Sequence, residues 1–271
     1  MLKGTAMFQF KVHKADKLST ALDLFNASDE PAYIAGGHTL IPTMKQRLSA
    51  PSDVIDLATI PGLDAITLVG DTLQIGAMAT HAKVAASSVV QEHCAALANL
   101  AGGIGDRQVR YRGTIGGSLA NNDPAADYPA AALGLGAQVV TDRRTIPSDT
   151  FFKAMFETAL EPDEIIQAIH FPQIDQAVYL KFPNPASRYA MVGVMLTRTA
   201  GETRIAITGA AASVFRAATF ETALTADFSV SAIEAVTLSA GTLNTDMHAS
   251  AEYRAHLCKV LIQRGVEALT A

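Results

Sequence analysis

Residues 32–57 read AYIAGGHTLIPTMKQRLSAPSDVIDL, and this stretch decides the fold of the first part of the chain. Its first four residues are apolar and precede a Gly-Gly pair, which predicts a short buried strand that ends at a turn. A helix is expected next, because Thr39 is a good N-cap residue and Pro42 falls near the first turn, where proline is tolerated. Residues 54–57 form a second strand-like run, so the order strand–helix–strand predicts a small parallel unit. The residues expected to share one face of the helix are Leu40, Met44 and Leu48.

Outside this unit, the spacing of apolar residues predicts a series of further elements. Asp123-Pro124 is a typical helix start, with Asp as the N-cap and Pro at the first helical position, so residues 125–133 are expected as a buried helix. The other elements expected before residue 172 are helices over residues 18–25 and 91–101, a short helix capped by Thr80, and strands over residues 72–76, 137–141 and 164–171.

Three prolines between residues 172 and 187 mark a change in composition that we interpret as a domain boundary. The expected domains are residues 1–176, with subdomains of about 1–58 and 59–176, and residues 177–271. In the second domain, strands are expected at residues 189–197 and 203–211. Gly201-Glu202 would form the turn of a hairpin between them. Residues 214–271 are mostly helical by pattern and end in a helix near residues 249–269.

Composition excludes several classes of protein. Hydrophobic residues make up 49% of the 271 residues and charged residues 17%, which is enough apolar material for a folded core. The net charge of −5 argues against nucleic-acid binding, which normally needs a basic surface. No apolar run approaches the ~20 residues of a membrane span, and no signal peptide is recognisable, so a cytoplasmic protein is expected. Cys94 and Cys258 are the only cysteines, too few for an iron–sulfur cluster or a zinc finger.

Two glycine clusters carry the candidate chemistry: residues 35–39 (AGGHT) and residues 113–118 (GTIGGS). Glycine lets backbone N–H groups turn toward a ligand, and it lets a phosphate approach without a Cβ in the way. The hydroxyls of Thr39, Thr114 and Ser118 add donors, and a helix starting at Thr39 would add its positive end. Two such loops could hold a pyrophosphate from both sides, although ordinary turns explain either loop alone equally well. No P-loop or dinucleotide-binding fingerprint of the G-x-G-x-x-G type is present.

Residues 33–42 (YIAGGHTLIP) resemble the first flavin motif of the FAD-binding medium subunits of molybdenum hydroxylases, the group that includes aerobic carbon monoxide dehydrogenase and xanthine dehydrogenase. Residues 108–120 (QVRYRGTIGGSLA), continuing to Asp123-Pro124 and Asp127, resemble the second motif. The resemblance covers almost the whole chain, with the C-terminal third less specific than the two motifs.

The resemblance implies an α+β fold: an FAD-binding domain of two subdomains, of the vanillyl-alcohol oxidase type, and a smaller α+β domain with a short antiparallel sheet and a helical bundle. FAD would lie non-covalently between the subdomains, with its pyrophosphate held by backbone amides and hydroxyls of the two motifs. No catalytic side chain and no metal ligand are expected. The residues expected to contact FAD are Ile34, Ala35, Gly36, Gly37, His38, Thr39, Leu40, Gly113, Thr114, Gly116, Gly117, Ser118, Asn121, Asp123, Asp127, Ile166 and Lys181.

The resemblance also implies a role in electron transfer. A large partner subunit would oxidise substrate at a molybdenum cofactor, and a small subunit would pass electrons through two [2Fe–2S] clusters to the flavin of this chain. The flavin would then reduce a terminal electron acceptor, and the complex is expected as a dimer of heterotrimers. Two alternatives are a self-contained FAD-dependent oxidase and a scaffold protein that has lost FAD. The chain departs from many relatives at residues 183–185 (PNP) and at Arg188, where Tyr189 is a candidate shield for the flavin ring.

Four side-chain patterns admit a second interpretation. His38 follows Gly-Gly, where some distant flavin oxidases attach the flavin covalently, but an ordinary loop or pyrophosphate contact is favoured. The arginines at 107, 110 and 112 could balance phosphate charge, although partner docking or a solvated face is at least as well supported. Asp123 is more simply a helix cap than one of an acid–base pair with Asp127. His93-Cys94 and His256-x-Cys258 offer two ligands each, too few to indicate a metal site.

Overall fold

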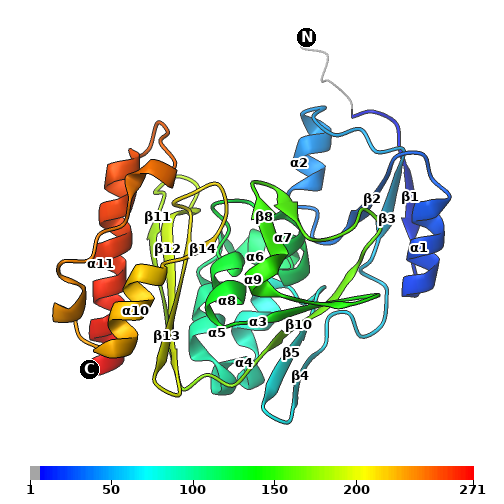
Figure 1. The fold of residues 1–271 in the computed structure, drawn as a ribbon. Helices are drawn as coiled ribbons and strands as arrows, with labels where there is room; N and C mark the ends of the chain where they lie inside the picture. Colours follow the sequence, from blue (N-terminus) through cyan, green and yellow to red (C-terminus); the bar gives the residue numbers. More distant parts are fainter. Residues whose placement is uncertain (1–6) are drawn as a thin grey trace.

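A computed structural model describes residues 7–271, so residues 1–6 of the expected first subdomain lie outside the described chain. Figure 1 shows three larger sheets that follow one another along the chain, each with helices beside it. A two-stranded ribbon, formed by β8 (Phe152–Ala154) and β9 (Glu157–Thr158), lies in the middle of the molecule. Helices and strands are mixed in each part, and the fold is α+β as expected.

The first sheet is parallel, with the strand order β1-β3-β2. The chain passes from β2 through α2 into β3, so the predicted strand–helix–strand unit is confirmed. The helix is shorter than expected. Arg47 adopts a left-handed φ of 60° just after α2, so Leu48 lies beyond the helix and is 76% exposed. The elements of this part are β1 (Lys11–Lys14), α1 (Leu18–Asn26), β2 (Pro31–Ile34), α2 (Leu40–Lys45) and β3 (Asp53–Asp56).

The second sheet has five antiparallel strands in the order β4-β5-β10-β6-β7. Ile169 in the central strand pairs with Ile75 on one side and Val139 on the other, and all three are buried. Their cluster includes side chains from α5, α7 and α8, which fixes these helices against the sheet. The strands are β4 (Ile66–Val69), β5 (Thr72–Gly76), β6 (Gln138–Thr141), β7 (Thr145–Pro147) and β10 (Ile166–Phe171); the helices are α3 (His81–Ala86), α4 (Ser88–His93), α5 (Ala95–Gly102), α6 (Arg107–Arg112), α7 (Ile115–Asn121), α8 (Tyr128–Gly134) and α9 (Ser148–Phe151).

The single helix expected over residues 91–101 is wrong. Cys94 has φ −153° and ψ 86°, outside the helical region, and it separates α4 from α5. The expected cap of α3 is confirmed, because the Thr80 hydroxyl accepts the Lys83 amide at 3.2 Å. Pattern alone identified helical character here but missed a break at one residue, because the apolar spacing continues across it.

The third sheet is antiparallel, with the order β11-β12-β13-β14. The predicted hairpin is confirmed, but its turn lies one residue earlier than expected: Thr199 pairs with Glu202 across a two-residue turn in which Ala200 and Gly201 have φ values of 50° and 86°. The first strand of this sheet, β11 (Gln176–Pro183), lies within residues 172–187, where only a boundary was expected. The helical prediction for residues 214–271 is correct for a helix over residues 218–226 and for the last helix, but loops and 3₁₀ turns occupy the segment between them. The elements are β11 (Gln176–Pro183), β12 (Ala190–Thr199), β13 (Glu202–Thr208), β14 (Phe215–Arg216), α10 (Ala218–Ala226), η1 (Ser231–Ile233), η2 (Ala240–Thr242) and α11 (Ala251–Thr270).

The third sheet packs against α8 of the preceding part. A Cβ added to Gly134 would lie 2.6 Å from Met195, so only glycine permits this approach between helix and strand. The Thr197 hydroxyl donates to the Gly134 carbonyl at 2.9 Å, and Arg204 bonds to both oxygens of Asp149 at 3.0 Å. These contacts fix the end of α8, together with α9, against β12 and β13.

Candidate functional site

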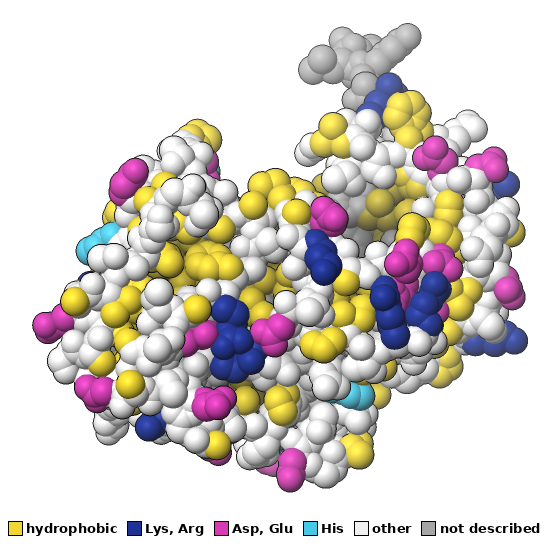
Figure 2. All heavy atoms as spheres, viewed as in Figure 1, with side chains coloured by type: hydrophobic (Ala, Val, Ile, Leu, Met, Phe, Trp, Pro, Cys, Tyr) yellow, Lys and Arg dark blue, Asp and Glu magenta, His cyan; other side chains and the backbone are white. Residues whose placement is uncertain are grey.

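A cavity of about 850 Å³ lies where the first sheet, the helices of the second part and the loop before β12 meet. This volume is within the range of about 300–1,000 Å³ that is typical of small-molecule and cofactor sites. Figure 2 shows the molecule hollowed beside α2, with hydrophobic side chains in the hollow. Every residue that was expected to contact FAD lines the cavity except Lys181: Ile34, Ala35, Gly36, Gly37, His38, Thr39, Leu40, Gly113, Thr114, Gly116, Gly117, Ser118, Asn121, Asp123, Asp127 and Ile166.

The two glycine clusters are in direct contact. A Cβ added to Gly36 would overlap the carbonyl oxygen of Arg112 and would lie 2.8 Å from the Cα of Gly113. On the other side of the contact, a Cβ added to Gly117 would lie 3.5 Å from the Cβ of Ala35. Backbone packs on backbone at Gly36, so the approach of the two segments requires glycine at this position. Segments far apart in the sequence thus form one wall of the cavity.

The first segment presents a row of available backbone donors. Gly37 has a φ of +74°, which turns the chain between β2 and α2. Within residues 7–271, the amides of Gly36, Gly37, His38 and Thr39 donate no hydrogen bond to the protein. The Thr39 side chain, at the N-cap of α2, makes no capping bond. Successive free N–H groups facing a cavity form an anion-binding arrangement, so this loop fits the diphosphate of a dinucleotide.

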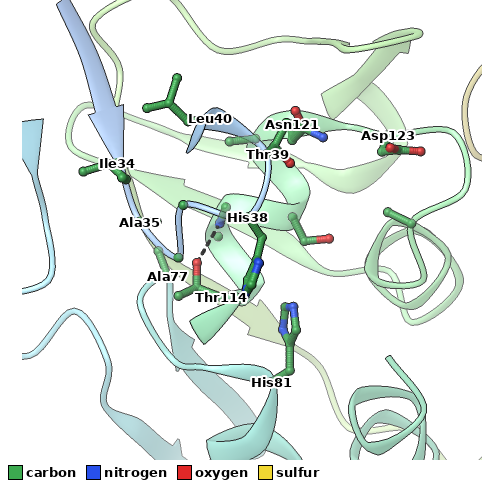
Figure 3. A pocket seen from close by; sticks show the side chains of 18 of the residues that line it. Ile34, Ala35, His38, Thr39, Leu40, Ala77, His81, Thr114, Asn121 and Asp123 are labelled. Atoms are coloured by element: carbon green, nitrogen blue, oxygen red, sulfur yellow. Dashed lines mark hydrogen bonds between the residues drawn. The ribbon is translucent and has the colours of Figure 1, made fainter. Parts of the chain in front are cut away.

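The second segment is not a loop but the beginning of α7, and it follows a helix instead of a strand. Thr114 is the N-cap, and its hydroxyl accepts the Gly117 amide at 3.1 Å. The Gly116 amide donates to Ala77 at 2.8 Å, the bond drawn in Figure 3, and the Ser118 amide donates to Thr114 at 3.0 Å. These amides already have acceptors. The segment can therefore offer the Ser118 hydroxyl and a surface without Cβ atoms, while the free amides belong to the first loop.

His81, the first residue of α3, is a cavity residue that the sequence did not reveal. Its side chain packs against Gly113, where a Cβ would overlap the ring, and Figure 3 shows it pointing toward His38. His81 is only 5% exposed and its Nδ1 has no hydrogen-bond partner among the described residues. Burial, together with nearby His38 and Arg110, lowers the pKa of His81 to about 4, so the ring is neutral at pH 7. The only signal in the sequence was its position directly after the Thr80 cap.

Asp127 and Lys181 are bonded to each other. The Lys181 ammonium donates to the Asp127 carboxylate at 2.9 Å, and the Tyr179 hydroxyl donates to it at 2.5 Å. Burial raises the pKa of Asp127, while Lys181 and Tyr179 oppose that shift. Asp127 lines the cavity, whereas Lys181 lies behind it and lines a smaller depression with Arg188. The pair joins the start of α8 to β11, across the contact between the second and third sheets.

The prediction that Asp123 caps a helix is wrong. The helix begins at Tyr128 with Asp127 at its N-cap position, and Asp123 instead accepts the Ala125 amide at 2.8 Å in the preceding turn. The turn also contacts the third sheet, because the Thr208 hydroxyl donates to the carbonyls of residues 124 and 126 at 3.0 and 2.7 Å. A proline in the first turn does mark the start of this helix, but the proline is Pro129 and not Pro124.

The opposite wall of the cavity is held by an ion pair. Glu164 lines the cavity, and Arg144 donates to its two carboxylate oxygens at 2.8 and 2.6 Å. These bonds lower the pKa of Glu164 to about 2. Ile166, at the start of β10, lies in the same wall and is buried. The turn between β6 and β7 therefore fixes the wall formed by residues 160–166.

The three arginines of α6 do not line the cavity. Arg107 and Arg112 are exposed, and Arg110 donates to the carbonyls of Ile104 and Gly105 at 2.9 and 3.0 Å. The positions of these three arginines therefore do not support the interpretation that they neutralise a phosphate in the cavity. Within residues 7–271, no three His, Cys, Asp or Glu side chains gather as a metal site would require, and no helix combines the length and apolar character of a membrane span.

Comparison with protein families identifies two matches along the chain. Residues 8–174 match the FAD binding domain in molybdopterin dehydrogenase, and residues 177–269 match the CO dehydrogenase flavoprotein C-terminal domain. The chain belongs to the family of FAD-binding medium subunits of molybdenum hydroxylases. The relation expected from the two motifs is confirmed, and this medium subunit carries an FAD-binding domain.

Proteins of known function are similar to this medium subunit over nearly its whole length. The chain is 35% identical to the nicotine 6-hydroxylase medium subunit of Paenarthrobacter nicotinovorans, covering 92% of this chain and 93% of that one. It is 32% identical to the carbon monoxide dehydrogenase medium chain of Hydrogenophaga pseudoflava, covering 97% and 98%. A solved carbon monoxide dehydrogenase from Hydrogenophaga pseudoflava superposes with a TM-score of 0.86 at 30% identity, over 98% of both chains. The relatives are subunits of oxidoreductase complexes, so this medium subunit is a flavoprotein of that class.

Proposed function

We propose that this chain is the FAD-carrying electron-transfer subunit of a molybdenum hydroxylase complex. The single observation that carries the proposal is the row of free amides at Gly36, Gly37, His38 and Thr39, which opens into a cavity of dinucleotide size. The donors suit a diphosphate, and family membership names the dinucleotide as FAD. Bound FAD would supply the redox chemistry, exchanging electrons singly or in pairs.

The chain itself would bind and orient the cofactor. The first loop would hold the diphosphate through its amides, and the other expected contacts that line the cavity would surround the rest of the cofactor. We further propose that FAD is held non-covalently and that the division between the FAD-binding and C-terminal domains falls after residue 176.

We infer the partners from the family. A large subunit would carry the molybdenum cofactor, and a small subunit would carry the [2Fe–2S] clusters that donate electrons to this chain. The assembly would be a dimer of heterotrimers in the cytoplasm, reducing a terminal acceptor at the flavin. The solved carbon monoxide dehydrogenases are molybdenum enzymes by their descriptions, which supports this assignment.

The test is purification of the chain from its native host under mild conditions, with metal and cofactor analysis. We expect two partner subunits, molybdenum, iron and FAD in one complex, and we expect acid precipitation to release the flavin into the supernatant. A solitary yellow protein that reduces oxygen with its own substrate would instead identify an oxidase. A colourless chain that gains no flavin from excess FAD would exclude both functions.

A further inference from the structure

The hairpin between β8 and β9 carries an aromatic residue in a conformation that aromatic residues avoid. Ala154 pairs with Glu157, so Met155 and Phe156 form a two-residue turn, and Phe156 has a φ of 57°. The second central position of a turn with positive φ normally takes glycine or asparagine. For a bulky side chain such a φ is a genuine outlier and costs about 1–2 kcal/mol.

A buried asparagine holds this turn in place. Asn122, at the end of α7, is fully buried and itself has a φ of 42°. Its side-chain amide donates to the carbonyls of Ala154 and Glu157 at 2.7 and 2.8 Å, and its backbone carbonyl accepts the Phe156 amide at 3.2 Å. Three hydrogen bonds from one residue therefore fix both ends of the turn. Strain that is fixed in this way clusters at functional sites.

The side chain of Phe156 has no role in the core. It is 58% exposed, and it belongs to none of the three apolar clusters that the described residues form. It does line the cavity, together with Leu160 and Ile166 from the segment that follows the hairpin. Figure 1 shows β8 beside α7, the helix whose first turn forms part of the cavity wall and whose end holds Phe156. Helix α7 therefore connects Phe156, which is bonded at its end, to the contact between the two glycine clusters at its beginning.

We propose that Phe156 is a cofactor-positioning residue, whose ring packs against a planar heteroaromatic ring of the dinucleotide in the cavity. The inference rests on the proposed FAD function and adds a contact to it. Aromatic rings prefer offset or edge-to-face contacts, which need a ring held at a defined position. The strained turn and the Asn122 bonds supply that position. A ring presented at the cavity surface can meet either the isoalloxazine or the adenine of FAD, and the experiment distinguishes them.

The test compares the full-length chain with Phe156→Gly, Phe156→Tyr and Met155→Ala by calorimetric titration with FAD, FMN and ADP, and by thermal unfolding without ligand. We expect Phe156→Gly to weaken FAD binding by about 2- to 12-fold, the value of an aromatic contact. Phe156→Tyr should retain the affinity. Met155 lies in the same turn, is 49% exposed and does not line the cavity, so Met155→Ala should bind like wild type.

Stability separates this role from a structural one. Glycine relieves the positive φ, so Phe156→Gly should unfold at the same temperature as wild type or higher while binding FAD less tightly. Weaker binding of FMN would identify the isoalloxazine as the ring contacted, and weaker binding of ADP would identify the adenine. Unchanged affinity for all three ligands would overturn the inference and leave the proposed function intact, and so would a lower unfolding temperature with unchanged binding. A wild-type chain that binds no FAD would end both.

Discussion

Replacing Gly36 with alanine tests the contact on which the site is built. The added Cβ would overlap the Arg112 carbonyl and meet the Gly113 Cα at 2.8 Å, so the obstacle is backbone, which cannot rotate away. Inserting a methyl group into a well-packed contact typically costs about 1–3 kcal/mol. At about 2–4 °C per kcal/mol for a chain of this size, the unfolding temperature should fall by about 2–12 °C.

The same substitution should weaken FAD binding, because the two segments that form one wall must separate. Where half of that cost, about 0.5–1.5 kcal/mol, falls on the bound state, the dissociation constant should rise by about 2- to 12-fold, at 1.4 kcal/mol per factor of ten. The assays are calorimetric titration with FAD and thermal unfolding. Gly102→Ala is the matched control, because its Cβ would meet no atom closer than 3.8 Å and Gly102 lies at the end of a helix. Gly36→Ala with wild-type stability and wild-type affinity would refute the reasoning.

Three further perturbations follow from the site. Lys181→Met should destabilise the chain by about 3–5 kcal/mol in a denaturant titration, because it leaves the buried Asp127 carboxyl without its ion-pair partner, and a loss below about 1 kcal/mol would show that the pair does not matter. The pKa of His81 is lowered to about 4, so the unfolded chain takes up a proton at a higher pH than the folded chain, and the free energy of unfolding should fall between about pH 6.5 and 4. In urea unfolding, His81→Phe should flatten the dependence of this free energy on pH in that range. An unaltered slope would contradict the assignment. The pKa of Glu164 is lowered to about 2, so its ion pair with Arg144 contributes stability above about pH 4.5, and this contribution is lost as the pH falls toward 2. Arg144→Met should therefore lose less stability on acidification than wild type. An identical midpoint of acid unfolding in wild type and variant would count against the role of this ion pair.

The sequence predicted the parallel unit, the central strands of the second sheet and the β12–β13 hairpin, because each rests on local periodicity and turn residues. It also predicted which glycines come together, since residues 35–39 and 113–118 match two motifs of one family. It misassigned the second motif as a loop. Gly116 and Gly117 signal flexibility in a sequence, but here Gly116 allows helix α7 to pack against Ala77, where a Cβ would lie 2.5 Å from the Ala77 Cβ.

Other features depend on contacts between distant parts of the chain and leave no local pattern. Lys181 and Asp127 were each expected to face the cofactor, yet they neutralise one another at the junction of two sheets. His81 is neutral and lies beneath Gly113 because α3 packs there, which no spacing reveals. Phe156 would read as an ordinary hairpin residue without its positive φ and the Asn122 bonds.

The central claim is that the free amides of residues 36–39 bind the diphosphate of FAD. A crystal structure of the chain with FAD tests it most directly. We expect phosphate oxygens at hydrogen-bonding distance, about 2.7–3.2 Å, from at least two of the four amide nitrogens. A diphosphate bound elsewhere, with those amides facing only water, would contradict the account.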